Sequence, residues 1–190
     1  MSLIMNWLDM GIPTTVDRVL RASRTLGHAR FYESNVMPQD EKTKLMELLK
    51  KQGKMLRNFE AKQCFHNSQM LIINTQNDPF FSQKLKYCEG YWMSPSIPIA
   101  IPHAWLVYDD KYVVDVTMTT RGIREPRLAN LSDRAICEFP EGWEYYGIVI
   151  DRDEIINYLT KFGETISVLD DYRITRKRLE ALEKELADRK

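Results

Sequence analysis

The chain has 190 residues, enough for one full hydrophobic core or for one domain with a helical appendage. Its 27 lysines and arginines balance 27 aspartates and glutamates, which argues against a nucleic-acid partner. No run approaches the ~20 apolar residues of a membrane span. Three cysteines without zinc-type spacing, and a first segment without a signal-peptide pattern, predict a reduced, cytoplasmic setting.

The N-terminal region, residues 1–61, is predicted to consist of helices and connections. Leucines near helical spacing indicate a helix over residues 40–57, which Gly53 interrupts. A second helix is expected to begin near Gln63, to run through CFHNSQMLIIN and to end at about Asn74.

The middle of the chain is rich in predicted strands. Aromatic and β-branched residues are dense in four segments, at residues 85–93, 103–109, 111–118 and 143–151. The stretch SPSIPIAIP lies between the first two segments. Its three prolines exclude a central strand or a helix, so we expect an ordered loop there.

The C-terminal region from Asp153 onward is predicted to be helical. Leu179, Leu182 and Leu186 have coiled-coil-like spacing, and charges of both signs surround them. This tail either packs on the rest of the protein or mediates self-association. We therefore expect one domain over residues 1–152, followed by a helical extension over 153–190.

The stretch PHAWLVYDDKYVVDVT carries a histidine and an aspartate on what reads as a hairpin. If its loop has three residues, Tyr108 pairs with Tyr112, and His103 and Asp115 become diagonal neighbours on one face. A two-residue loop would place them on opposite faces, because a slip of one residue inverts the relation.

Cys64 is the candidate nucleophile for this pair. It stands at the expected start of a helix, where free N–H groups and the helix dipole favour a thiolate. An imidazole held by a carboxylate is an oriented base, so Cys64, His103 and Asp115 could act as nucleophile, base and orienting group. The alternative is that Cys64 is only a small buried hydrophobic residue, as free cysteines often are.

The order of these elements resembles the transglutaminase-like core of the papain-like cysteine enzyme superfamily. The matching pieces are Cys64, EGY (89–91), HAW (103–105) and VVDVT (113–117), so the resemblance covers residues 64–117. It implies an α+β fold in which the helix bearing the cysteine packs on an antiparallel sheet. The regions outside the motif would add N- and C-terminal helices.

The resemblance implies acyl transfer through a thioester on Cys64, and the backbone N–H of Cys64 would receive the oxyanion. Asn58 or Gln63 could supply a second oxyanion donor. The family commonly has glycine close before its cysteine and proline after its aspartate, whereas Gln63 and Val116 stand here. These departures leave the substrate class open.

Hydrolysis of an amide or isopeptide bond in a protein, a peptide or a small amide is the favoured reaction. No cofactor is implied, and no histidine, cysteine and aspartate cluster has the spacing of metal ligands. The alternative from another functional class is a non-catalytic binding or assembly protein that retains the fold.

Overall fold

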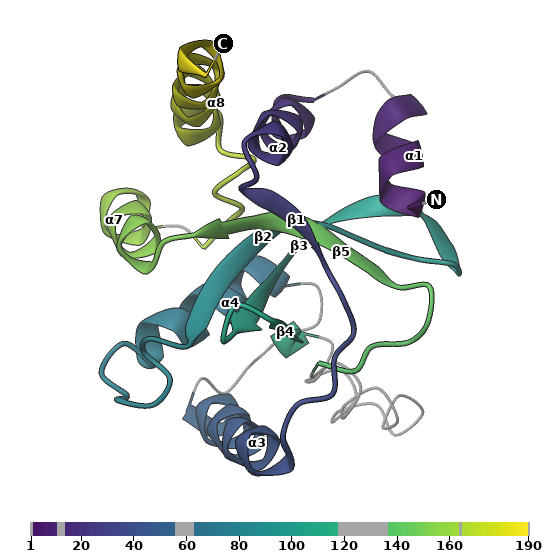
Figure 1. Ribbon diagram of the computed structural model, residues 1–190. Coiled ribbons are helices and arrows are strands. Elements are labelled where there is room, and N and C mark those ends of the chain that lie inside the picture. Colours follow the sequence, from purple (N-terminus) through teal and green to yellow (C-terminus); the bar gives the residue numbers. More distant parts are fainter. Residues whose placement is uncertain (1, 11–13, 56–62, 118–136, 164, 190) are drawn as a thin grey trace. The chain divides into compact units, whose positions relative to one another are not determined.

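The computed structural model describes residues 2–10, 14–55, 63–117, 137–163 and 165–189 (Figure 1). Within them the chain is α+β, with six helices and a five-stranded sheet in the order β1-β5-β2-β3-β4. The helices are α1 (Leu3–Met10), α2 (Thr15–Thr25), α3 (Gln39–Met55), α4 (Cys64–Asn74), α7 (Arg152–Phe162) and α8 (Tyr172–Asp188). The strands are β1 (Ala29–Tyr32), β2 (Leu85–Ser94), β3 (Ile97–Tyr108), β4 (Tyr112–Val114) and β5 (Glu144–Ile150).

Several predicted elements are confirmed with their boundaries. Strands β2 and β5 match the predicted strands to within one residue at each end, and α4 begins at Cys64 and ends at Asn74. The helix predicted over residues 40–57 is α3, but its interruption at Gly53 is wrong, because α3 continues to Met55. A glycine inside a helix costs only about 1 kcal/mol relative to alanine, which the burial of leucines on the same helix outweighs.

Two segments that were expected to be irregular are strands. β1 lies in the region predicted as helices and connections, and it pairs antiparallel with β5, from Ala29 opposite Ile148 to Tyr32 opposite Tyr145. β3 begins at Ile97, so the predicted loop is wrong from that residue onward. β4 pairs only with residues 106–108 of β3. The first half of β3 is therefore an edge on that side within the described residues, and an edge tolerates proline.

Of the two loop lengths considered for the β3–β4 hairpin, the structure has the three-residue one. Tyr108 stands opposite Tyr112, and the ladder continues to Leu106 opposite Val114. β4 is shorter than the predicted strand over 111–118, because residues 116 and 117 are helical; residue 118 lies outside the described residues.

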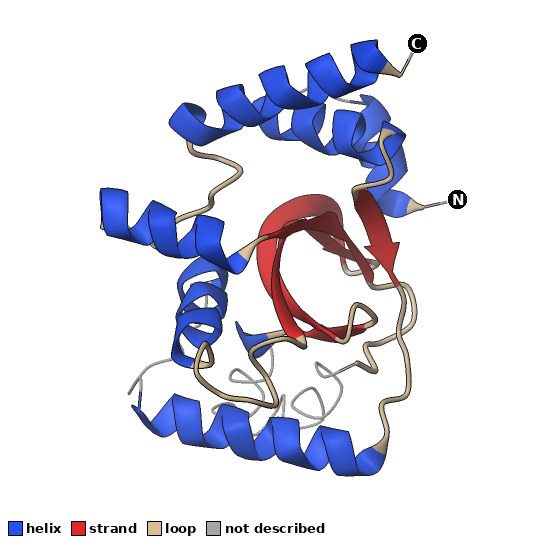
Figure 2. Cartoon of the chain, turned by 60° about the vertical axis from the view of Figure 1, so that its left-hand side comes forward, coloured by secondary structure: helices blue, strands red, loops and turns tan. Residues whose placement is uncertain are grey.

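The chain forms two compact units, of which the first comprises Met1–Tyr32, Cys88–His103 and Gly142–Lys190. In this unit α8, the helix that ends at the C mark, lies beside α2 (Figures 1 and 2). Leu179 and Leu182 of α8 are buried, and Arg18 of α2 forms a 3.0 Å ion pair with Glu183. The predicted helical tail is thus confirmed as α7 and α8, which a non-helical connection separates.

A carboxylate from β5 caps the first helix of this unit. Glu144 accepts hydrogen bonds from the Ser2 hydroxyl at 2.7 Å and from the backbone N–H groups of Leu3 and Ile4, both at 2.9 Å. An eight-residue helix is too short to be stable alone, and its first N–H groups need partners. Glu144 supplies those partners and fixes α1 at the start of β5.

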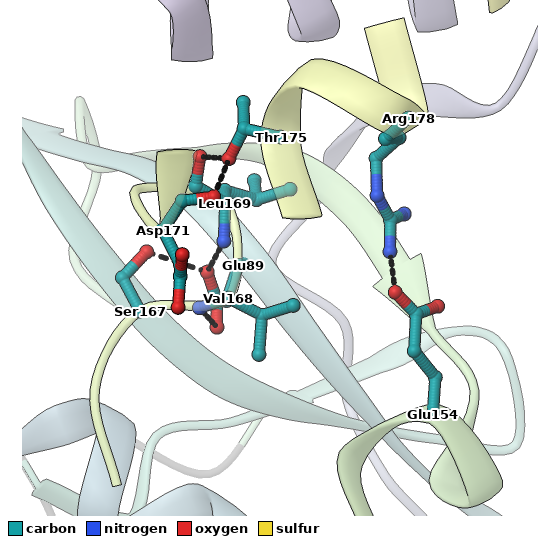
Figure 3. A network of polar contacts seen from close by, with 8 residues as sticks. All are labelled: Glu89, Glu154, Ser167, Val168, Leu169, Asp171, Thr175 and Arg178. Carbon is teal, nitrogen blue, oxygen red and sulfur yellow. Dashed lines mark hydrogen bonds and ion pairs between the residues drawn. The ribbon is translucent and has the colours of Figure 1, made fainter. Parts of the chain in front are cut away.

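The carboxylate of Glu89, which is buried, holds the connection between α7 and α8 (Figure 3). It accepts hydrogen bonds from the Ser167 hydroxyl at 2.8 Å and from the backbone N–H groups of Val168 and Leu169, both at 2.9 Å. Thr175 of α8 donates to the carbonyl oxygens of Leu169 and Asp171. The glutamate of the EGY motif therefore has a structural role in this unit.

The second compact unit comprises Glu33–Tyr87 and Ala104–Glu141. It contains α3, α4, β4 and parts of β2 and β3. Its core includes aliphatic side chains from both helices and both strands of the hairpin: Leu45, Leu71, Ile72, Leu106, Val107 and Val114. None of the described helices in either unit has the length and apolar character needed to cross a membrane.

Candidate functional site

Cys64 is the first residue of α4 and has a free thiol. The residue as a whole is 7% exposed. The N-cap residue is Gln63, whose side chain makes no capping hydrogen bond. In the first turn of the helix, the Asn67 backbone N–H donates a hydrogen bond to the Gln63 carbonyl oxygen at 2.9 Å. Serine, threonine, aspartate or asparagine would normally cap such a helix with the side chain. The start of α4 therefore lacks a side-chain cap from its own N-cap residue, which suits a position that receives an anion.

Two polar side chains one turn after Cys64 anchor α4 within the second unit. Asn67 Nδ2 donates to Thr117 Oγ1 at 3.0 Å, and Ser68 Oγ donates to the Ala104 carbonyl oxygen at 3.3 Å. Both side chains are fully buried. Residues three and four apart share a helix face, so this anchored face is also the face of Cys64.

The two hydrogen-bond acceptors stand close in sequence to the other candidates. Ala104 directly follows His103, and Thr117 comes two residues after Asp115. The resemblance in sequence, which rests on Cys64 and three short motifs, did not point to Asn67 or Ser68. The available signal was their polarity at the third and fourth positions after Cys64, on a helix whose other half is apolar.

His103 lies on β3 among aromatic rings of the first unit and is 8% exposed. Its ring centroid is 6.3 Å from that of Trp92 and 6.2 Å from that of Tyr145. Trp143 meets Trp92 edge to face, with 5.0 Å between the ring centroids. The imidazole is thus set in apolar aromatic surroundings. From the sequence, Trp143 and Tyr145 were predicted only to lie in a strand, and their proximity to His103 was not predicted.

Asp115 directly follows β4 and is fully buried. It was expected inside a strand, but the strand ends one residue earlier and a helical turn begins one residue later. A buried carboxylate is costly unless other groups satisfy it, so Asp115 requires hydrogen-bonding or charged partners.

Asn58 and Gln63 were the candidates for a second oxyanion donor. Asn58 lies outside the described residues, and Gln63 is exposed.

The other two cysteines differ from Cys64 in their surroundings. Burial holds the pKa of the Cys88 thiol well above its usual range, and the thiol donates to the Tyr32 hydroxyl oxygen at 3.6 Å. Burial raises the pKa of Cys137 to about 12. Cys64 is also buried but keeps 7% exposure, whereas Cys88 and Cys137 have 0%, and a thiol without solvent access does not match the setting of a reactive cysteine.

Metal ligands and pockets in the described part of the chain were the remaining features. No group of three or more histidine, cysteine, aspartate or glutamate side chains there could hold a metal ion. A pocket of about 550 Å³ lies along α7 and the start of α8, and Cys64, His103 and Asp115 are not among its lining residues. No family model, no curated protein and no solved structure matches the chain.

Proposed function

We propose that this protein is a cysteine-dependent acyl-transfer enzyme with a papain-like, transglutaminase-like arrangement, and that it hydrolyses an amide or isopeptide bond. The observation that carries the proposal is the attachment of α4. The helix that begins with Cys64 is hydrogen-bonded, through Asn67 and Ser68, to residues next to the other two candidates. A buried polar anchor of this kind supports a fixed orientation of the helix start.

The proposed reaction has two stages. The Cys64 thiolate attacks the carbonyl carbon of the substrate, and the N–H groups at the start of α4 stabilise the oxyanion. His103 donates a proton to the leaving amine as the C–N bond breaks, which leaves a thioester on Cys64. Water, deprotonated by His103, then attacks the thioester carbonyl, the C–S bond breaks, and the acid is released.

Asp115 would keep the imidazole of His103 in the tautomer that can act as a base. Complete burial suits this role, since a carboxylate shielded from water interacts more strongly with a positively charged imidazolium than an exposed one does. The aromatic rings beside His103 would shield the base from bulk water during the first stage, before the leaving amine departs.

The test is alkylation of the cysteines by iodoacetamide, followed peptide by peptide by mass spectrometry from pH 5 to pH 9. In the wild-type protein Cys64 should be labelled fastest near pH 6. His103→Ala should slow this labelling strongly, and Asp115→Ala should slow it less. Cys64→Ser serves as the control, because it removes the reactive thiol and keeps the shape of the site.

Equal labelling of all three cysteines, or an unchanged rate in His103→Ala, would reject the enzyme in favour of a binding or assembly protein with the same fold. Self-association through α8 would then be the first property to measure. Leu179 and Leu182 are already buried within the chain, so a partner would have to use other residues of that helix.

A further inference from the structure

Strand β3 carries exposed isoleucines in the segment that precedes His103. Ile97 is 37% exposed, Ile99 is 56% exposed and Ile101 is partly exposed. Side chains on a strand alternate between its two faces, so these three residues and His103 lie on the same face. We call the three side chains the isoleucine track.

The track changes from solvent-exposed to buried along the strand. Ile99 is more than half exposed, Ile101 is partly covered, and His103 is 8% exposed. From Ile99 to His103 the strand covers about 13 Å. An extended ligand on the track would therefore lie partly in solvent at one end and reach the buried imidazole at the other.

The chemistry of the track favours an alkyl chain as the occupant. No charged residue lies between Ile97 and His103, and the rings beside His103 are those of Trp92 and Tyr145. The three isoleucine side chains are apolar, so they bind a ligand by removing its apolar carbon from water.

The edge of β3 is poorly suited to a peptide strand. A peptide that extends a sheet binds through alternating backbone N–H and C=O groups. Proline stands at positions 98 and 102, and proline has no backbone N–H to donate. The affinity available here therefore comes from the isoleucine side chains, which suits an acyl chain better than a peptide backbone.

We propose that the isoleucine track binds the linear acyl chain of the substrate, so that the scissile bond belongs to an amide of an aliphatic acid. This inference rests on the proposed function for the role of His103 and narrows its substrate class. The acyl chain lies along Ile97, Ile99 and Ile101, and its carbonyl group lies at the buried end of the track.

The test uses octanoyl-glycinamide, with acetyl-glycinamide as the short-chain control. Both are titrated into Cys64→Ser protein whose isoleucine methyl groups are labelled with carbon-13, and binding is followed by NMR. The octanoyl compound should shift the methyl signals of Ile97, Ile99 and Ile101 in a saturable way. The signal of Ile166, which is 45% exposed and does not belong to β3, should not move.

Two matched variants locate the binding surface. Ile99→Ser should weaken binding of the octanoyl compound roughly fivefold to tenfold, because it removes much of one apolar contact. Ile166→Ser alters an isoleucine of similar exposure and should leave binding unchanged. In parallel, mass spectrometry of wild-type protein treated with p-nitrophenyl octanoate measures acylation of Cys64.

The NMR titration tests the isoleucine track, and the acylation measurement tests the proposed enzyme, so the two proposals can fail separately. Acylation of Cys64 without shifts at the track overturns the isoleucine track and supports the enzyme. Shifts at the track without acylation support the track as a binding surface and overturn the enzyme. Equal binding of the acetyl and octanoyl compounds overturns the track, whatever the acylation result.

Discussion

The Tyr91 hydroxyl of β2 donates a 2.7 Å hydrogen bond to Oδ1 of Asp17, the residue that closes the capping box of α2 with Thr14. Both partners are buried, and burial, followed by the bond to Asp17, raises the pKa of the Tyr91 phenol. The tyrosine is therefore a neutral donor. It satisfies the buried carboxylate of Asp17 and links α2 to β2.

Tyr91→Phe should destabilise the protein by about 1.5–3 kcal/mol, the usual cost of losing a hydrogen bond to a charged group. Urea unfolding followed by circular dichroism measures the change. Tyr112→Phe is the matched control, since Tyr112 is also buried and its hydroxyl makes no hydrogen bond within the described residues. Equal losses in the two variants would contradict the role given to the Tyr91 hydroxyl.

Gly90→Ala should disrupt the pairing of β2 with β5. A Cβ atom at this position would collide with the Tyr146 carbonyl oxygen and lie 2.5 Å from the Gly147 Cα. Backbone cannot move aside as a side chain can, so we expect a loss of about 3 kcal/mol or more. The readout is the thermal unfolding midpoint of the purified variant.

Gly27→Ala provides the comparison for Gly90. Gly27 has a positive φ of 82°, but nothing lies within 4 Å of an added Cβ. Only backbone strain of about 1 kcal/mol is expected there. A Gly90 variant no less stable than the Gly27 variant would show that the two strands can separate at little cost.

Stability should fall in alkaline solution. Burial raises the pKa of Cys137 to about 12, whereas the same thiol in the unfolded chain titrates near its usual value of ~8.5. Between these values the unfolded chain releases a proton that the folded chain retains, so alkali favours unfolding. The loss from this thiol is on the order of 1 kcal/mol per pH unit above about pH 9.

Urea midpoints at pH 7, 9 and 10 measure this dependence. Cys88 contributes in the same direction, because burial also raises the pKa of its thiol. Cys137→Ala removes one titrating group and should make the decline shallower. A midpoint that stays constant up to pH 10 would mean that these thiols are accessible to hydroxide in the folded protein.

Glu89→Gln should loosen the connection between α7 and α8. The amide keeps the shape of the side chain but replaces a charged acceptor of three hydrogen bonds with a neutral one. We expect a loss of about 1.5–3 kcal/mol. Amide hydrogen exchange at Val168 and Leu169 should accelerate in the variant, and an unchanged exchange rate at these two residues would contradict the bonding described.

The hairpin shows how far the sequence alone could lead. A loop of three residues between Tyr108 and Tyr112 predicts the observed register, because strand pairing beside a short loop follows from the loop length. The sequence alone also allowed a two-residue loop, so it gave the register only conditionally. The start of α4 at Cys64 was likewise predictable, since the polar stretch before it and the apolar residues after it mark a boundary. These are local features, set by neighbours in sequence.

The missed features depend on contacts between distant residues. β1 has no alternation of its own and exists as a strand because Ala29 through Tyr32 meet β5. The start of β3 at Ile97 could not be inferred, because proline is excluded from a central strand but not from an edge. The role of Glu89 was also hidden, since its partners stand 78 to 80 residues later in the chain.

The cap that Glu144 provides for α1 has a consequence for synthesis on the ribosome. The Ile4 N–H and the Glu144 carboxylate are 140 residues apart, so α1 is completed only after these 140 residues have followed it out of the exit tunnel. The unit formed by Glu33–Tyr87 and Ala104–Glu141 has all its residues before β5 is made. We therefore expect α1 to remain exposed to chaperones and proteases until late in translation, and to gain protection when β5 emerges.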